Sequence, residues 1–285
     1  MAFTEIEEAQ TRAKFVDTLI KQIAPEKYVM KQAVVIISTD AWVNYFWREG
    51  RDVLTGQSGN AIGGIPRLAE FPQASAEWER LDSILTKYGL EENISWEDLR
   101  TSEIDIMTRT SIKIVEGVSD VVDQAIYDGL AGDAAVQTLD ISAGYEWNAG
   151  SAAIIDNLFE CAEKFKDYNL PTNKIYCFMN SRDKRSLMVY MAEKGAQWMN
   201  ISEKIAVTGG IGTIAGMTLI ETKAAPASEA LVVIPKRCGT WRENQALTTI
   251  TKEDPYRSMT IRAVEMGTLQ VHEPKAIVKI SNTEA

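Results

Sequence analysis

The stretch TSEIDIMTRTSIKIVEGVSDVVDQAIYDGLAG, residues 101–132, is the strongest helical pattern in this chain. Apolar or small side chains recur at spacings of three and four residues: Ile104, Met107, Ser111, Ile114, Val118, Val121 and Ala125. This spacing places them along one face of a helix. The pattern predicts one helix from Thr101 to Leu130, ended by Ala131 and Gly132, about 45 Å long at its usual rise per residue. Such a helix would span a whole domain.

The segment before this helix combines a second amphipathic pattern with an aromatic cluster. Thr4 and Glu7 have the spacing of a capping box, and apolar residues follow at helical spacing up to Ala24. We expect this helix to dock on its own domain, because three heptads are short for an independent coiled coil. Lys31 to Ile37 predicts a buried strand. Ala41 to Trp47 gathers two Trp, a Tyr and a Phe, which indicates anchoring in a core or at an interface.

Two segments of contrasting composition lie between this cluster and the long helix. From Leu54 to Gly64 the chain is rich in Thr, Gly, Gln, Ser and Asn, which predicts a hinge or the base of a loop. From Ile65 to Arg100 the periodicity is weak and aromatic residues are scattered among many charges. We therefore expect an extended excursion here rather than part of a core. Ten acidic against four basic residues between Ile65 and Asp105 give this stretch a charge of −6.

The remainder of the chain predicts helices first and strands later. Helices are expected from Ala149 to Tyr168 and from Ser181, as N-cap, to Gly195, with a strand from Lys174 to Met179 between them. The strands expected after these are Ala206–Val207, Met217–Glu221, Ala230–Ile234, Ala246–Thr251, Thr260–Glu265 and Ala276–Ile280. Because helices and strands do not alternate regularly, the order favours an α+β fold over a doubly wound sheet.

Composition and charge narrow the class of protein. The chain has 285 residues, of which 45% are hydrophobic and 25% charged, as in an ordinary folded globular protein. Its net charge of −10 opposes diffuse binding to nucleic acid or anionic membranes. The longest apolar runs are too short to cross a bilayer, and the first residues lack a signal-peptide pattern, so we expect a cytoplasmic protein. Three widely spaced cysteines, Cys161, Cys177 and Cys238, indicate buried free thiols.

Sequence patterns for chemistry are weak. Gly209 to Gly216 is the only glycine-rich candidate for a phosphate loop, but a strand pattern follows it where a nucleotide site needs a helix, so a tight hairpin is expected. His272 is the only histidine, and no nucleophile motif accompanies it. We therefore predict a structural histidine, no catalytic residue, no metal site and no cofactor.

The order of the elements resembles the major capsid proteins of tailed viruses, which have the Hong Kong 97 type fold. Three places carry the resemblance, which extends from about Asp52 to Ile280. Trp78 to Asp105 looks like the descending arm of the family's extended E-loop entering its spine helix. Ala125 to Gly132 is similar to the end of that helix, and Gly212 to Pro235 looks like the hairpin near the end of the axial domain.

The resemblance implies a division of the chain and a function. It implies an N-terminal arm over 1–60, an E-loop over 61–100, a peripheral domain with the spine helix over 101–148, an axial domain over 149–236 and returning peripheral strands over 237–285. The implied function is to self-assemble through pentamers and hexamers into the icosahedral shell of a virion around double-stranded DNA, which such an acidic chain would bind non-specifically. Portal, scaffold or decoration proteins are the further partners, with assembly in the host cytoplasm and no membrane.

The resemblance also implies that the acidic excursion lies across a neighbouring subunit. Its carboxylates would then meet basic side chains of that neighbour. The residues expected at this intersubunit contact are Arg67, Glu70, Trp78, Glu79, Arg257 and Arg262. Deletion of Pro66 to Glu92 should leave a folded subunit, because the core is expected elsewhere, and should abolish closed particles.

Two other functions stay open at this point. Encapsulin nanocompartments resemble the same fold at similar length and enclose enzymes instead of a genome. An enzyme with an unrecognised α+β fold is the alternative of a different class, and it would show a concave pocket lined by perturbed titratable groups.

Overall fold

Helix α3 (Ile106–Ala131) is the longest helix of the computed structural model, which describes residue 18 and residues 28–49, 67–68, 70, 78–101, 105–193 and 213–284. The helix was predicted, but its start was wrong by five residues. Asp105 caps it by accepting a hydrogen bond from the backbone N–H of Thr108 at 3.1 Å, and Thr101 instead ends the short helix α2 (Trp96–Thr101). The buried stripe runs through Ile114, Val115, Val118, Val122 and Ile126, whereas Val121 is exposed.

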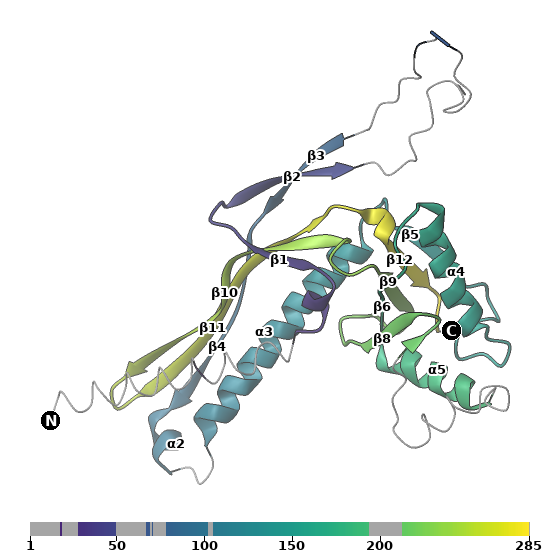
Figure 1. Ribbon diagram of the computed structural model, residues 1–285. Helices are drawn as coiled ribbons and strands as arrows, with labels where there is room; N and C mark the ends of the chain where they lie inside the picture. Colours follow the sequence, from purple (N-terminus) through teal and green to yellow (C-terminus); the bar gives the residue numbers. More distant parts are fainter. Residues whose placement is uncertain are drawn as a thin grey trace.

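A four-stranded sheet packs against one side of α3, in the order β1-β10-β11-β4 (Figure 1). Its strands are β1 (Val35–Ser38), β10 (Gly239–Asp254), β11 (Ser258–Val271) and β4 (Thr86–Ser95). β10 and β11 form a long antiparallel hairpin, β4 continues it antiparallel to β11, and β1 runs parallel to β10. The strands predicted at 246–251 and 260–265 are the middle parts of this hairpin.

Two segments differ from their predictions because of their places at the edges of this sheet. β4 lies within the predicted excursion, yet it pairs with β11 from Thr86 to Ser95 and buries Ile94. The strand predicted from Lys31 to Ile37 is a 3-10 turn, η1 (Met30–Gln32), followed by the edge strand β1, whose Ile36 and Ile37 are exposed rather than buried.

A two-stranded antiparallel ribbon projects from this sheet (Figure 1). It consists of β2 (Val43–Glu49) and β3 (Trp78–Ile84), which pair over their whole length. The boundary expected between residues 60 and 61 therefore does not follow the strand pairing, because residues on both sides of it build one ribbon.

A six-stranded sheet forms the other half of the molecule, in the order β5-β12-β9-β6-β8-β7. Its strands are β5 (Gln137–Asp140), β6 (Ile175–Met179), β7 (Thr213–Ile214), β8 (Met217–Glu221), β9 (Glu229–Val233) and β12 (Ile277–Ser281), the last preceded by the 3-10 turn η4 (Pro274–Ala276). Pairing places β5 and β12 in this sheet, whereas the resemblance implied the peripheral domain for both segments.

Helices α4 (Ile154–Asp167) and α5 (Ser181–Glu193) cover one face of the six-stranded sheet. Alternate residues of the central strands face them, as Cys177 and Val232 do, while Phe178 and Leu231 point to the opposite face, towards α3. The predicted strand at 174–179 and helix at 181–195 are thus present in the described residues.

Local details of this half correct two expectations and confirm one. Ser181 is the first residue of α5 and not its N-cap, because the side chain of Asn180 accepts from the N–H of Arg182 at 3.1 Å. α4 begins at Ile154, five residues later than expected. The predicted tight hairpin is present between β7 and β8, where Ala215 and Gly216 have φ of 52° and 77°.

Several expectations lie outside the described residues. These are the N-terminal helix apart from Thr18, the glycine-rich segment 54–64, the C-terminal end of the predicted helix at Gly195 and the strand at 206–207.

Candidate assembly surfaces

The β2–β3 ribbon has one face against the body of the protein and one face in solvent. The side chains of β2 alternate between them: Asn44 and Phe46 are buried, while Val43, Tyr45 and Trp47 are exposed. Aromatic and β-branched residues at period two favour this strand conformation. The sequence alone does not give this division, because the buried positions are a polar Asn44 and an aromatic Phe46 among exposed apolar and aromatic residues.

The inner face fixes the ribbon to the end of the long sheet. Phe46 packs edge-on against His272, with ring centroids 5.3 Å apart. The side chain of Gln270 on β11 donates to the hydroxyl of Ser83 at 2.8 Å, and this hydroxyl donates to the carbonyl of Asn44 at 3.2 Å. Arg48 forms an ion pair with Asp133, just beyond the end of α3. The ribbon therefore leaves the body in a defined direction.

The outer face carries large apolar side chains that no described part of the chain covers. Exposed fractions are 61% for Tyr45, 58% for Trp47 and 56% for both Trp78 and Ile84. Opposite pairing brings Val43 beside Ile84 and Trp47 beside Arg80, whose guanidinium lies 4.3 Å from the centre of the Tyr45 ring. We name this surface the ribbon face; it comprises Val43, Tyr45, Trp47, Trp78, Arg80, Asp82 and Ile84. A contiguous exposed apolar surface of this kind marks an interaction site.

A second aromatic group, half-buried at Trp96 and exposed at Tyr256, lies at the far end of the long sheet. Trp96, at the start of α2, packs against Tyr256 in the β10–β11 turn, with ring centroids 5.4 Å apart. The guanidinium of Arg100 lies 4.3 Å from the Trp96 ring. Beside them, Arg257 and Asp254 form an exposed ion pair at 3.5 Å.

The six residues predicted at an intersubunit contact are exposed but do not form one surface. Trp78 and Glu79 lie on β3, and Glu79 is 4.0 Å from Arg48. Arg67 and Glu70 are exposed in the segment before β3, while Arg257 lies in the turn at the far end of the long sheet.

The last of these residues, Arg262, has a partner within its own chain. Its guanidinium contacts Glu91 on the neighbouring strand β4, with Nη2–Oε2 at 2.6 Å and Nε–Oε2 at 2.7 Å. Glu91, a carboxylate of the acidic excursion, thus neutralises Arg262 within the same chain. The prediction was that Arg262 would meet the excursion of a neighbouring subunit.

The histidine and the cysteines that were considered for chemistry lie in packing contacts of the fold. His272 is half-buried against the ribbon, and this burial lowers the pKa of its imidazole. All three cysteines are buried and free, as predicted, and burial raises the pKa of Cys161 and of Cys238 to about 12. Among the described residues no group of three or more His, Cys, Asp and Glu side chains could hold a metal ion. No helix in the described part of the chain is long and apolar enough to cross a membrane.

A comparison with protein families matches residues 79–280 to the family described as phage capsid protein. This match covers more than half of the chain and includes the long helix and strands of both sheets, but not β1. A search of curated proteins finds no match.

Solved structures show the same fold at low sequence identity. A virus-like particle from Pyrococcus furiosus aligns with a TM-score of 0.64 at 9% identity, over 94% of this chain and 98% of that chain. The capsid of the cyanophage P-SCSP1u gives 0.65 at 13% identity, over 89% and 88%. A structure of Mycobacterium phage Che8 gives 0.65 at 14% identity, over 90% and 92%. The α+β fold is therefore of the Hong Kong 97 type.

Proposed function

Because this chain belongs to the family of phage capsid proteins, we propose that it assembles through pentamers and hexamers into the icosahedral shell of a tailed virus. It is a structural protein that forms a shell from copies of itself. Beyond this, we propose that the capsomers are pentamers and hexamers, that the shell is that of a virion, and that it encloses double-stranded DNA.

The ribbon face is the observation that best supports this mode of assembly. Tyr45, Trp47 and Trp78 are each more than half exposed, on a ribbon whose inner face is fixed to the body. Burial of such side chains contributes about 1.5–3 kcal/mol each. A second copy of the chain is the partner that a shell provides at every position, so we assign the ribbon face to the contact between subunits.

The predicted contact residues can be ordered by their positions relative to this surface. Trp78 belongs to the ribbon face, with Glu79 beside it and Arg67 and Glu70 in the segment before β3, so this group would meet one neighbour. Arg257 would contribute to a separate contact together with Trp96 and Tyr256. We propose that Arg262 lies at the rim of a contact between subunits, because its charge is already paired with Glu91.

The strand pairing supports a modified division of the chain. We assign the E-loop to residues 43–84, the peripheral domain to α3 with the four-stranded sheet, and the axial domain to the six-stranded sheet with α4 and α5. This division moves β5 and β12 from the peripheral to the axial domain.

The remaining parts of the proposal follow from charge and from the family. A net charge of −10 keeps contact with packaged DNA weak and non-specific, which suits a genome that must be packed and released. Portal, scaffold or decoration proteins would complete the particle, with assembly in the host cytoplasm. We also propose that the shell protein has no enzymatic activity, since no catalytic constellation was found in the sequence.

Electron microscopy of the purified full chain tests the proposal. We expect closed particles or rings of subunits for the wild-type protein. The variants Tyr45→Ser and Trp47→Ser should remain folded and fail to form particles, whereas the control Tyr145→Ser, at an exposed residue outside the ribbon, should assemble. Monomers of the wild-type protein, or normal particles from both ribbon variants, would contradict the assignment.

A shell that encloses cargo proteins is the second candidate, because the virus-like particle from Pyrococcus furiosus aligns with 94% of this chain. Particles expressed together with the genes that flank this one distinguish the two functions. Nuclease-protected DNA inside the particles supports the viral shell, and a copurified enzyme without DNA supports the compartment.

A further inference from the structure

The long β10–β11 hairpin changes its neighbours near its base, where Glu243 lies opposite Gly267. β1 pairs with residues 240–243 of β10, whereas β4 pairs with residues 258–267 of β11. The near part of the sheet is therefore β1-β10-β11 and the far part is β10-β11-β4. At the junction the ladder of hydrogen bonds shifts register twice, between Glu243 and Gln245 and between Gln245 and Thr248. Irregularities of this kind bend a strand.

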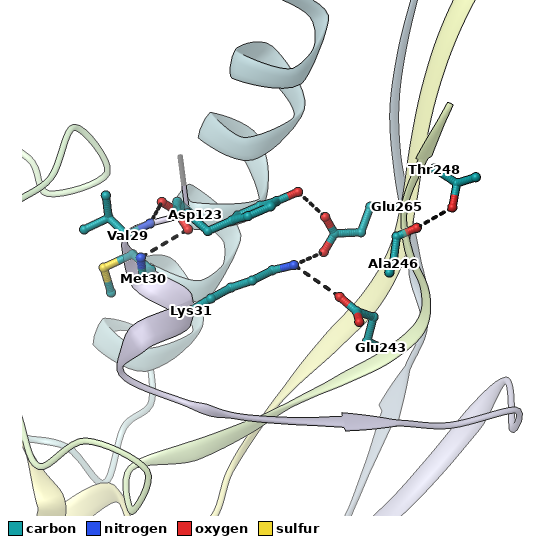
Figure 2. Close-up of polar contacts among 9 residues, drawn as sticks. Val29, Met30, Lys31, Asp123, Glu243, Ala246, Thr248 and Glu265 are labelled. Atoms are coloured by element: carbon teal, nitrogen blue, oxygen red, sulfur yellow. Dashed lines mark hydrogen bonds and ion pairs between the residues drawn. The ribbon is translucent and has the colours of Figure 1, made fainter. Parts of the chain in front are cut away.

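A buried polar cluster lies at this junction (Figure 2). Lys31 Nζ is 2.6 Å from Glu265 Oε1 and 3.2 Å from Glu243 Oε1. The hydroxyl of Tyr28 donates to the other carboxylate oxygen of Glu265. On the opposite side, Asp123 of α3 accepts the backbone N–H groups of Val29 at 2.8 Å and Met30 at 3.2 Å. We call Tyr28, Lys31, Asp123, Glu243 and Glu265 the clasp.

The clasp joins three separate parts of the fold. Residues 28–33, which we call the docked segment, supply Tyr28 and Lys31, α3 supplies Asp123, and the two strands on either side of the irregular ladder supply Glu243 and Glu265. Lys31 Nζ also lies 3.9 Å from the centre of the Tyr28 ring and 5.9 Å from that of Trp241, so aromatic rings as well as carboxylates surround the ammonium group.

The burial of these groups makes the contacts depend on one another. Glu265 is fully buried, and Lys31 and Tyr28 are the partners that compensate its charge. A buried carboxylate without a partner is costly, so undocking of the segment would destabilise the junction in its present form. Asp123 is also buried and ties the same segment to α3.

We propose that the clasp is a lock on a hinge in the long sheet: while residues 28–33 are docked, Lys31 holds Glu243 and Glu265 together and fixes the angle between the two parts. Release of the docked segment would free this angle. The consequence for shells rests on the proposed function, because one chain that builds pentamers and hexamers must fit more than one curvature. The hinge itself does not depend on assembly.

Hydrogen exchange of the full-length chain, followed by mass spectrometry of its peptides, tests the lock. Lys31→Met keeps the aliphatic stem and removes the charge. Lys279→Met is the matched control, because Lys279 forms a comparable ion pair with Glu229 at 2.7 Å in the six-stranded sheet. We expect Lys31→Met to speed exchange roughly tenfold or more in the docked segment and in residues 243–248 and 264–267 alike. Exchange in β6 and β9 should stay unchanged in Lys31→Met, and the control should leave the docked segment and residues 243–248 and 264–267 near their wild-type rates.

Two further variants test the lock in case Lys31→Met does not fold. Glu243→Gln removes only the more exposed partner of Lys31, and Lys31→Met combined with Glu265→Gln removes the buried charge as well as its cation. Either should show the same local pattern as Lys31→Met. Unchanged exchange, faster exchange in the docked segment alone, or an equal increase over the whole chain in these variants would overturn the lock. Because exchange is measured without reference to particles, a failure of assembly leaves this result interpretable.

Discussion

The long-sheet region and the six-stranded region of this protein bury their apolar residues in different ways. The long-sheet region consists of α2, α3, the four-stranded sheet and the ribbon; the six-stranded region consists of its sheet with α4 and α5. In the six-stranded region both faces of the sheet are covered, by α4 and α5 on one side and towards α3 on the other. In the long-sheet region the ribbon face and the edge strand β1 are left without cover from the described chain.

The exposed aromatic residues follow the same division. Trp42, Tyr45, Trp47, Trp78 and Tyr256 all belong to the long-sheet region, while Tyr145 and Phe159 are the exposed aromatic residues of the other within the described chain. The difference teaches that one region covers its own apolar faces, while the other leaves aromatic residues exposed that the proposed function assigns to contacts with further copies. It also means that stability and assembly can be changed separately by substitutions.

The largest effect is expected from a charge in the buried stripe of α3. Val118→Asp places a carboxylate without a partner in the core, at a cost of several kcal/mol, which removes much of the stability of a typical domain. We expect insoluble or unfolded protein, measured by solubility and circular dichroism. Val121→Asp, three residues further along the same helix but exposed, is the control and should fold. Folded, soluble Val118→Asp would show that this stripe is not core.

The next largest effect is expected on the assembly of particles, without a change in the stability of the subunit. Replacement of residues 50–77 by Asn-Gly joins β2 and β3 through a short hairpin turn and leaves both sheets intact. We expect a thermal unfolding midpoint within a few degrees of wild type and no closed particles by light scattering. The longer deletion from Pro66 to Glu92 should instead unfold the long-sheet region, because it removes most of β4. Shells of native size from the Asn-Gly variant would contradict the part in the contact given to the replaced residues, Arg67 and Glu70 among them, because the ribbon face itself is kept in this variant.

A smaller difference is expected in the pH dependence of the two regions, each of which contains a buried aspartate with a raised pKa. Burial raises the pKa of Asp123 in the long-sheet region to about 6, and that of Asp183 in the six-stranded region to about 7, from 3.8. The folded protein then binds these protons more tightly than the unfolded chain, so each group adds stability below about pH 4 that is lost as the pH rises through its raised pKa.

Urea unfolding at a series of pH values separates the two carboxyl groups. Asp123→Asn should remove a fall in the free energy of unfolding between about pH 4 and 6, and Asp183→Asn should remove one between about pH 4 and 7. Unchanged slopes in both variants would show that the two carboxyl groups titrate normally in the folded protein.

The smallest effect concerns the ion pair between Arg262 and Glu91, in which both side chains are about half exposed. Arg262→Ala should lower the free energy of unfolding by about 0–1 kcal/mol, and less at high salt. Chemical denaturation at two salt concentrations measures this difference. A loss of particles at unchanged stability would instead place Arg262 in a subunit contact.

The sequence predicted elements whose pattern is local and missed those fixed by distant partners. The stripe of α3, the strands β6 and β8 and the β7–β8 turn all depend on neighbouring residues, and they were found. β4 was missed because most of its side chains are exposed and Ile94 is its one buried residue, so its strand conformation comes from pairing with β11. The N-terminal ends of α3 and α5 were misplaced because Asp105 and Asn180 cap these helices, and neighbouring residues in the sequence are equally suitable as caps.

The candidate surface was predictable only in part, for the same reason. The aromatic content of Ala41 to Trp47 indicated an anchor, but which side chains face solvent depends on the pairing of β2 with β3, some 35 residues away. The clasp could not be found from sequence, since Lys31, Asp123 and Glu265 are brought together by the fold alone.

The central claim is that further copies of this chain cover the ribbon face. A cryo-electron microscopy reconstruction of the assembled wild-type particle, at a resolution that shows side chains, tests it most directly. We predict that Tyr45, Trp47 and Trp78 are covered by a neighbouring subunit in every copy of the shell, while α4 and α5 cover the six-stranded sheet within one subunit as they do here. A closed shell in which these three side chains remain in solvent would contradict the claim.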